Sequence, residues 1–285
     1  MGQVYEARHH LTGRRVALKR VSAGALALTP GAEQRVLDEA AACGALRHPG
    51  VVEILDAGRT EEGDLFLVFE YLDGQNLELA LRQRRVAPKE LVRLAARLLG
   101  ALGAVHDAGW VHRDVKPSNV FLARGRSGPV EVKLLDFGIA TRLGAPPDER
   151  PLMGTIEYMS PEQATGDPCG VASDLWSVGA LLHRGLVDRP PWPARVPSDR
   201  RHSLVSAPPD LRALRPELPA DLAAVVARAL EPLPERRWAS AEVFASALLA
   251  VRESALATLG PPAAPPAGPR ADDRTEPAWL VDEAR

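Results

Sequence analysis

The feature that most constrains this chain is a run of polar residues at positions 112–119, which stands between two apolar segments. The run places a carboxylate, a cation and a carboxamide within six residues, at Asp114, Lys116 and Asn119. A second carboxylate, Asp136, follows seventeen residues after Asn119. Carboxylate and amide oxygens suit Mg²⁺, a separate carboxylate can orient a hydroxyl, and a lysine can neutralise a phosphate. The set therefore favours phosphoryl-transfer chemistry.

The hydrophobic pattern changes character near residue 74. Before it, alternating or β-branched runs predict strands, and one segment predicts a helix; the strands are 4–7, 14–21, 51–56 and 65–70, and the helix is 29–46. After it, an apolar stripe from Pro88 to Leu102 predicts a helix with one buried face. Short strands at 120–122 and 130–135 and helices at 175–187, 220–230 and 240–252 follow. The pattern predicts an α+β fold with a small sheet-rich lobe and a larger, mainly helical lobe.

The order of these motifs resembles the bacterial eukaryotic-like (Hanks-type) serine/threonine protein kinases. The run at 112–119 matches the catalytic loop of that family, and Asp136-Phe137-Gly138 matches its metal-binding motif. Further matches follow in the family's order: Val16-Ala17-Leu18-Lys19, Glu39 ahead of His48-Pro49, Ser160-Pro161-Glu162, Asp174-Leu175-Trp176-Ser177 and Arg237. The resemblance implies a two-lobed kinase domain over 1–253, with lobes of about 1–72 and 73–253. A Pro/Ala-rich tail, predicted to be disordered, covers 254–285.

The resemblance assigns catalytic roles to residues on both sides of the nucleotide. It implies that Lys19 contacts the α- and β-phosphates of ATP and pairs with Glu39. Asp114 would orient the substrate hydroxyl, and Lys116 would neutralise the transferred phosphoryl group. Asn119 and Asp136 would hold Mg²⁺ or Mn²⁺. Thr155 would bond Asp114 and Lys116, which is typical of the serine/threonine class.

The resemblance also implies how adenine is bound. Residues 70–72, from Glu70 to Leu72, would form the hinge whose backbone meets adenine, and Phe69 would be the gatekeeper. The base would lie between apolar side chains of the two lobes, and the loop over the phosphates would contribute a glycine; these residues are Gly2, Val4, Ala17 and Phe121.

Three departures from the family pattern stand out. Gly2 and Val4 match only the end of the glycine-rich loop, so the resemblance predicts a truncated loop that lacks the first strand. Two explanations are open: Met1 is an internal methionine of a longer loop, which the intact downstream motifs favour, or the chain is genuinely truncated and binds nucleotide weakly. No Ser, Thr or Tyr lies between Arg142 and Gly154, which predicts activity without phosphorylation of that segment, with Asp148 and Glu149 supplying negative charge. Asn76 and Ser118 occupy positions where relatives that prefer basic peptides carry acidic residues.

Composition excludes several other classes. The net charge of −2 argues against nucleic-acid binding, and no apolar run is long enough to span a membrane. Two cysteines, Cys43 and Cys169, form no disulfide framework, and the chain is predicted to be cytoplasmic. The sequence indicates no oligomeric state. Of 35 basic residues only four are lysines; the motifs explain Lys19 and Lys116, while Lys89 and Lys133 are interpreted as surface charges.

Two alternatives stay open at this stage. A catalytically weak pseudokinase that serves as a scaffold would explain the incomplete loop, but such proteins typically lose one of the four residues Lys19, Asp114, Asn119 and Asp136. A small-molecule phosphotransferase would share the fold. The segment from Thr155 to Glu162 argues against it, because the resemblance gives that segment a role in shaping a peptide-binding ledge.

Overall fold

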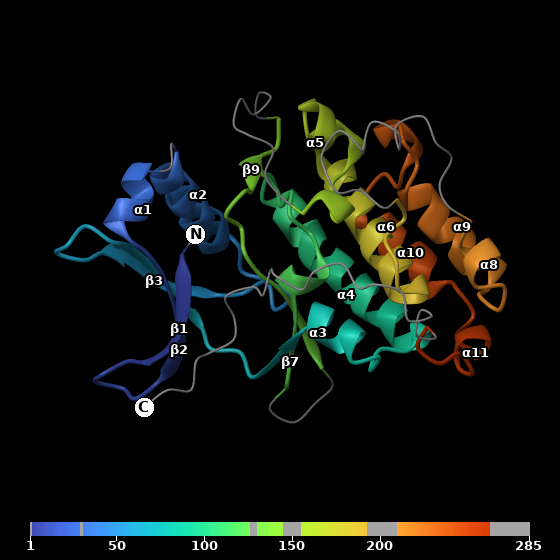
Figure 1. Cartoon of the computed structure of the whole chain (residues 1–285), viewed down its shortest axis with the longest axis horizontal. Coiled ribbons are helices and arrows are strands. Elements are labelled where there is room, and N and C mark those ends of the chain that lie inside the picture. Colours follow the sequence, from blue (N-terminus) through green and yellow to red (C-terminus); the bar gives the residue numbers. More distant parts are fainter. Residues whose placement is uncertain (1, 29–30, 126–129, 145–154, 193–209, 263–285) are drawn as a thin grey trace, which may run out of the picture.

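The computed structural model describes residues 2–28, 31–125, 130–144, 155–192 and 210–262. These residues form two lobes, with a small sheet and two helices in one and most of the helices in the other (Figure 1). The predictions made for Asp148, Glu149 and most of the tail lie outside the described residues. The α+β prediction is confirmed.

The N-terminal lobe is built on one antiparallel sheet with strand order β1-β2-β4-β3. Its strands are β1 (Gln3–Arg8), β2 (Arg15–Val21), β3 (Ile54–Arg59) and β4 (Leu65–Glu70). Burial alternates along β4, as expected for a strand with one face on a core. The predicted strand at 51–56 is shifted, because the Leu134 N–H bonds the Gly50 carbonyl at 2.8 Å and the Val52 N–H bonds the Leu134 carbonyl at 3.1 Å. The backbone ahead of β3 therefore pairs with the other lobe.

Two helices, α1 (Ala23–Leu28) and α2 (Ala32–Ala45), lie beside this sheet, where the sequence predicted one. The buried residues of α2 recur at helical spacing and include Glu39, Ala42 and Cys43. Cys43 is 2% exposed and thus packs as a small buried apolar group. The α2 helix thus turns one charged side chain, Glu39, inward.

The C-terminal lobe is organised around two long helices, α4 (Pro88–Asp107) and α6 (Val171–Val187). The stripe predicted on α4 is buried, and this helix packs against α6 and α10 (Figure 1). The shorter helices are α3 (Leu77–Arg82), α5 (Pro161–Thr165), α8 (Leu211–Leu214), α9 (Ala220–Ala229), α10 (Ala241–Leu249) and α11 (Glu253–Leu256). Among the described residues, no helix is long and apolar enough to cross a membrane.

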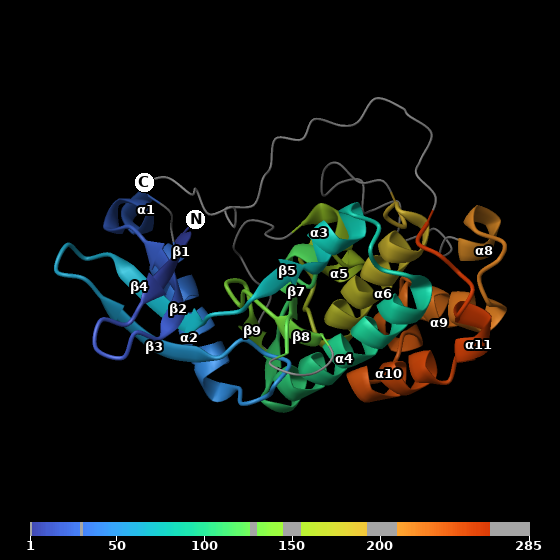
Figure 2. The same cartoon turned by 90° about the horizontal axis from the view of Figure 1, so that it is seen from below.

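Two small sheets lie between the N-terminal sheet and these helices (Figure 2). One has the order β5-β7-β8, with strands β5 (Gly74–Asn76), β7 (Val120–Ala123) and β8 (Glu131–Leu134). The other pairs β6 (Trp110–Val111) with β9 (Thr141–Arg142). The described residues also contain the 3₁₀ turns η1 (Pro117–Asn119), η2 (Ile156–Tyr158) and η4 (Pro234–Arg236). Gly74 is required in β5, because a Cβ there would lie 2.1 Å from the Leu122 carbonyl oxygen at φ 153°.

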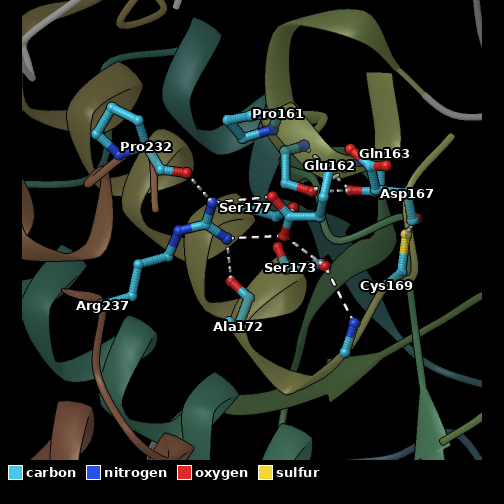
Figure 3. A network of polar contacts seen from close by, with 12 residues as sticks. Pro161, Glu162, Gln163, Asp167, Cys169, Ala172, Ser173, Ser177, Pro232 and Arg237 are labelled. Carbon is cyan, nitrogen blue, oxygen red and sulfur yellow. Dashed lines mark hydrogen bonds and ion pairs between the residues drawn. The ribbon is translucent and has the colours of Figure 1, made fainter. Parts of the chain in front are cut away.

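A buried ion pair anchors the segment after η2 to the C-terminal end of the lobe (Figure 3). Arg237 donates to both carboxylate oxygens of Glu162, at 2.8 and 2.9 Å, and neither side chain is more than 9% exposed. The other N–H groups of Arg237 bond carbonyl oxygens of residues 172, 231 and 232. Ser173 also donates to Glu162, at 2.6 Å. The match of Glu162 to Arg237 implied by the resemblance therefore corresponds to a direct contact.

Candidate active site

One buried carboxylate, Asp174, holds the backbone of the loop at residues 112–119 in place. Asp174, on α6, accepts the backbone N–H groups of His112 and Arg113 at 2.9 and 2.8 Å. The His106 ring also bonds Asp174, at 2.8 Å. Burial alone would raise the pKa of Asp174, but these donors hold the pKa below its ordinary value. Asp174 thus stabilises a loop in which Arg113 adopts a left-handed conformation with φ 68°.

The chemistry-bearing residues of this loop converge on Asp114. Lys116 Nζ lies 2.7 Å from Asp114 Oδ2, and Asn119 Nδ2 donates to the same oxygen at 3.0 Å and to the Asp114 carbonyl at 2.9 Å. Thr155 shares a small cavity with Asp114, but among the described residues no hydrogen bond joins its hydroxyl to Asp114 or Lys116. The role assigned to Thr155 stays a prediction.

A second charged cluster joins three segments that are far apart in sequence. Lys19, on β2, lies 2.7 Å from both carboxylate oxygens of Glu39 on α2. It also lies 3.2 Å from Asp136 Oδ1, just beyond β8. The predicted pair of Lys19 with Glu39 is therefore present, and Asp136 joins it. The Gly138 N–H supports the same Asp136 oxygen at 3.3 Å, in a turn where Asp136 has φ 59°.

This cluster has one ammonium group between two carboxylates in a largely buried place. Burial and the nearby Asp136 raise the pKa of Glu39 to about 7, against the opposing effect of Lys19. Burial acts against ionisation of Lys19, but Asp136 and Glu39 outweigh it and raise the pKa of that amine. Burial opposes ionisation of Asp136 too, but Lys19 holds its pKa below the ordinary range. An ionised Asp136 beside an ammonium is a favourable setting for phosphate and metal charges.

A cavity of about 320 Å³ opens between the lobes beside these clusters. Most of the predicted ATP-binding residues line it, namely Val4, Ala17, Lys19, Glu39, Phe69, Glu70, Leu72 and Phe121, and so does Asp136, a predicted metal ligand. Gly2 is not among the described residues that line it; a Cβ on Gly2 would lie 2.8 Å from the Arg20 carbonyl oxygen. Asn76 and Ser118, the two uncharged residues singled out in the sequence, also line the cavity.

The residues of the cavity fit ATP and a divalent cation in shape and donor chemistry. Apolar side chains of both lobes form walls suited to a flat base, and the ammonium of Lys19 lies at one side. Within the described part of the chain, Asp136 Oδ2 and Asn119 Oδ1 accept no hydrogen bond. Lys19 and Gly138 donate to the other oxygen of Asp136, and Asn119 donates to Asp114 through its amide nitrogen. A carboxylate and an amide oxygen remain available for a hard cation.

Two aromatic residues near the site are structural. His112 and Phe137 are fully buried, with ring centroids 4.8 Å apart in an edge-to-face arrangement. The His112 ring also contacts the Leu135 carbonyl at 3.0 Å. Their burial and mutual contact indicate that both are packing residues.

Sequence reasoning missed two features of the site. Asp174 was matched only as the start of a helix, and its hold on the loop backbone has no local sequence signal. Lys133 was interpreted as a surface charge, which is wrong: the residue is 8% exposed and its Nζ lies 2.6 Å from Glu70. The scarcity of lysine was the available signal, because arginine is the default cation of this chain. Lys89, by contrast, lies at the surface beside Glu253.

Comparison with known proteins gives a consistent result. The model of the family described as "Protein kinase domain" matches residues 1–249. A probable serine/threonine-protein kinase of Streptomyces coelicolor is 36% identical over 251 residues, which are 85% of this chain and 37% of that protein. The serine/threonine-protein kinase pkn3 of Myxococcus xanthus is 35% identical, covering 98% of this chain and 56% of the relative. The kinase PknB of Mycobacterium tuberculosis is 34% identical, with 93% and 42% covered. The chain thus spans between about a third and three fifths of the length of these relatives.

Proposed function

Since this chain belongs to the protein kinase family, we propose that it is an ATP-dependent protein serine/threonine kinase, which transfers the γ-phosphoryl group of ATP to hydroxyls of protein substrates. The observation that carries the proposal is the contact of Lys19 with both Glu39 and Asp136, at 2.7 and 3.2 Å. These residues come from three distant segments, and their meeting assembles a phosphate-binding cation next to a metal-binding carboxylate. Lys116 supports the serine/threonine class, and so do the relatives, which are named as serine/threonine-protein kinases.

In this proposal each lobe contributes a separate task. Lys19 neutralises and orients the α- and β-phosphates, and Glu39 fixes the ammonium by accepting from it. Asp114 accepts or orients the proton of the substrate hydroxyl while the oxygen attacks the γ-phosphorus. The bond from that phosphorus to the β–γ bridging oxygen breaks, and ADP leaves. Lys116, 2.7 Å from Asp114, neutralises charge on the transferred group.

Asp136 and Asn119 are the residues that would hold Mg²⁺ or Mn²⁺ through oxygens that no described donor occupies. When bound, the cation supplies positive charge beside the phosphates. Asn119 has a second task, since its amide nitrogen fixes the Asp114 carboxylate at 3.0 Å. The same side chain therefore links the metal site to the residue that receives the proton.

The pseudokinase alternative is not favoured by these observations. All four residues whose loss typifies such proteins are present, and their side chains take part in two clusters, one around Lys19 and one around Asp114. Asn76 and Ser118 bring no negative charge to the cavity, so we propose no preference for basic peptides. A cytoplasmic location and the absence of nucleic-acid binding stay predictions from composition.

The experiment that tests the proposal is transfer of label from γ-labelled ATP to a mixed panel of serine, threonine and tyrosine peptides. We expect label on serine or threonine peptides and at least about a 100-fold loss in Asp136→Asn. Binding of ADP, followed separately by calorimetry, shows whether a silent protein still has a nucleotide site. Tight ADP binding without any transfer in the unaltered protein would refute the kinase proposal and restore the scaffold alternative.

A further inference from the structure

Lys133 is a buried lysine to which neither the motifs nor the proposed chemistry gives a role. It lies on β8, and its ammonium is 2.6 Å from Glu70 Oε1. The two side chains are 10% and 20% exposed, so the pair is largely shielded from water. Charges in such a place are strongly destabilising when one partner is removed, because the other is left unpaired. The pair therefore restrains the position of Glu70 and of the segment that begins there.

Glu70 is the last residue of β4 and the first residue of the hinge between the lobes. It lines the cavity together with Tyr71 and Leu72. Its carboxylate accepts the Glu53 N–H at 3.0 Å, and its own N–H donates to the Glu53 carbonyl at 2.9 Å. The backbone of Glu70 is thus bonded to the N-terminal lobe. Its carboxylate is bonded to both lobes, to the Glu53 N–H on one side and to Lys133 on the other.

The strand that carries Lys133 belongs to the other side of the cavity. Lys133 is paired with Phe121 across β7 and β8, and Phe121 lines the cavity. Its neighbour Leu134 exchanges backbone bonds with the segment ahead of β3, at 2.8 and 3.1 Å. Asp136 lies three residues after Lys133. One lysine therefore connects the apolar surface under the base to the hinge beside the base.

We propose that Lys133 is a positioning residue that fixes the hinge at the adenine end of the cavity by pairing with Glu70. This inference rests on the proposed function, in which the cavity takes ATP. The pair does not hold the protein in an inactive state, because Lys19 contacts Glu39 and Asp136 in the same structure. The lobes are thus assembled for phosphate binding while Lys133 and Glu70 are joined.

A hinge that contacts only adenine acts equally on bound ATP and on the transition state, since the base takes no part in the reaction. Loss of such an interaction raises KM for ATP and leaves kcat almost unchanged. A purely structural role would instead lower the fraction of folded protein and reduce kcat at unchanged KM. The two roles are therefore separable by steady-state kinetics.

The test compares Lys133→Met, which keeps the apolar stem, with Lys89→Met as the matched control at the surface pair with Glu253. We expect Lys133→Met to raise KM for ATP and the Kd for ADP by about fivefold or more, with kcat within about twofold. Lys89→Met should leave all three values unchanged. Lys133→Arg keeps the charge and should lie closer to the unaltered protein than Lys133→Met does.

Glu70→Gln serves as the second variant if Lys133→Met fails to fold, because glutamine keeps an oxygen for the Glu53 N–H and loses only the charge. It should raise the Kd for ADP in the same direction. An unchanged Kd for ADP in a folded Glu70→Gln or Lys133→Met protein overturns the inference, and so does a fall in kcat at unchanged KM. ADP binding is measured without turnover, so a protein that binds ADP and transfers no phosphate refutes the proposed function and leaves this test standing.

Discussion

Replacing Arg237 by alanine is expected to lower the free energy of unfolding more than any surface change in this lobe. Its guanidinium places all five N–H groups on protein acceptors: two on Glu162 and one each on the carbonyls of residues 231, 172 and 232. Breaking a buried pair by removing one partner costs about 3–5 kcal/mol. Arg237 also lies over the Trp176 ring, at 4.8 Å from its centroid, so packing is lost as well. We expect a loss of at least about 4 kcal/mol, a large part of the 5–15 kcal/mol typical of a folded domain.

Urea denaturation followed by tryptophan fluorescence measures this loss, because Trp176 lies beside the substituted residue. Arg236→Ala is the matched control, since Arg236 is adjacent and exposed and its loss should cost less than about 0.5 kcal/mol. Arg237→Lys keeps a charge and loses the two-pronged contact, and it should fall between the two. A cost below about 1 kcal/mol for Arg237→Ala would refute the reasoning that the buried carboxylate depends on this partner.

The pair of Arg237 and Glu162 should also make the free energy of unfolding depend on pH. Burial raises the pKa of Glu162, but Arg237 outweighs burial and holds the pKa below the ordinary value. The unfolded chain therefore binds a proton at Glu162 at higher pH than the folded chain does. The stability from this pair is present above about pH 4.3 and is lost as the pH falls through the lower folded value. Arg237→Ala should show a weaker loss of stability over that range than the unaltered protein.

Three further predictions concern single groups. Lys19→Met should lower kcat/KM for ATP by about 100-fold, as transfer of labelled phosphate would show. Burial lowers the pKa of His183 to about 4, so on acidification the unfolded chain binds a proton at this residue before the folded chain does. The free energy of unfolding should therefore fall by up to about 3 kcal/mol between about pH 6.5 and pH 4. Urea denaturation at these two pH values should show a smaller fall in His183→Gln. Burial raises the pKa of the Cys43 thiol, so a thiol reagent should modify Cys169 in the native protein and Cys43 only after denaturant is added, as peptide mapping would show.

Much of the fold could be predicted from the sequence because its signals are local. The stripe on residues 88–102 determined the longest helix, and alternation determined the N-terminal strands. The start of β3 could not be predicted, because residues 50–52 bond to Leu134 of another sheet and not to their neighbours in sequence. Helix α1 was missed for a related reason: its six residues contain no buried side chain to produce a stripe.

The catalytic residues were predicted from motif spacing, whereas their supports were not. Asp174 acts through backbone N–H groups of residues about sixty positions away, a contact that no spacing rule encodes. Lys133 reaches Glu70 across 63 positions. The sequence signal for Lys133 was its residue type alone, a lysine in a chain that uses arginine almost everywhere else. Composition thus indicated which residue was unusual, and only the structure showed its partner.

The measurement that tests the central claim most directly is phosphoamino-acid analysis of substrates labelled from γ-labelled ATP, with the unaltered protein and Asp114→Asn side by side. The account predicts phosphoserine or phosphothreonine with the unaltered protein, and at least about a 100-fold lower rate with Asp114→Asn while ADP binding persists. Equal rates for the two proteins would contradict it, because Asp114 would then take no part in the transfer.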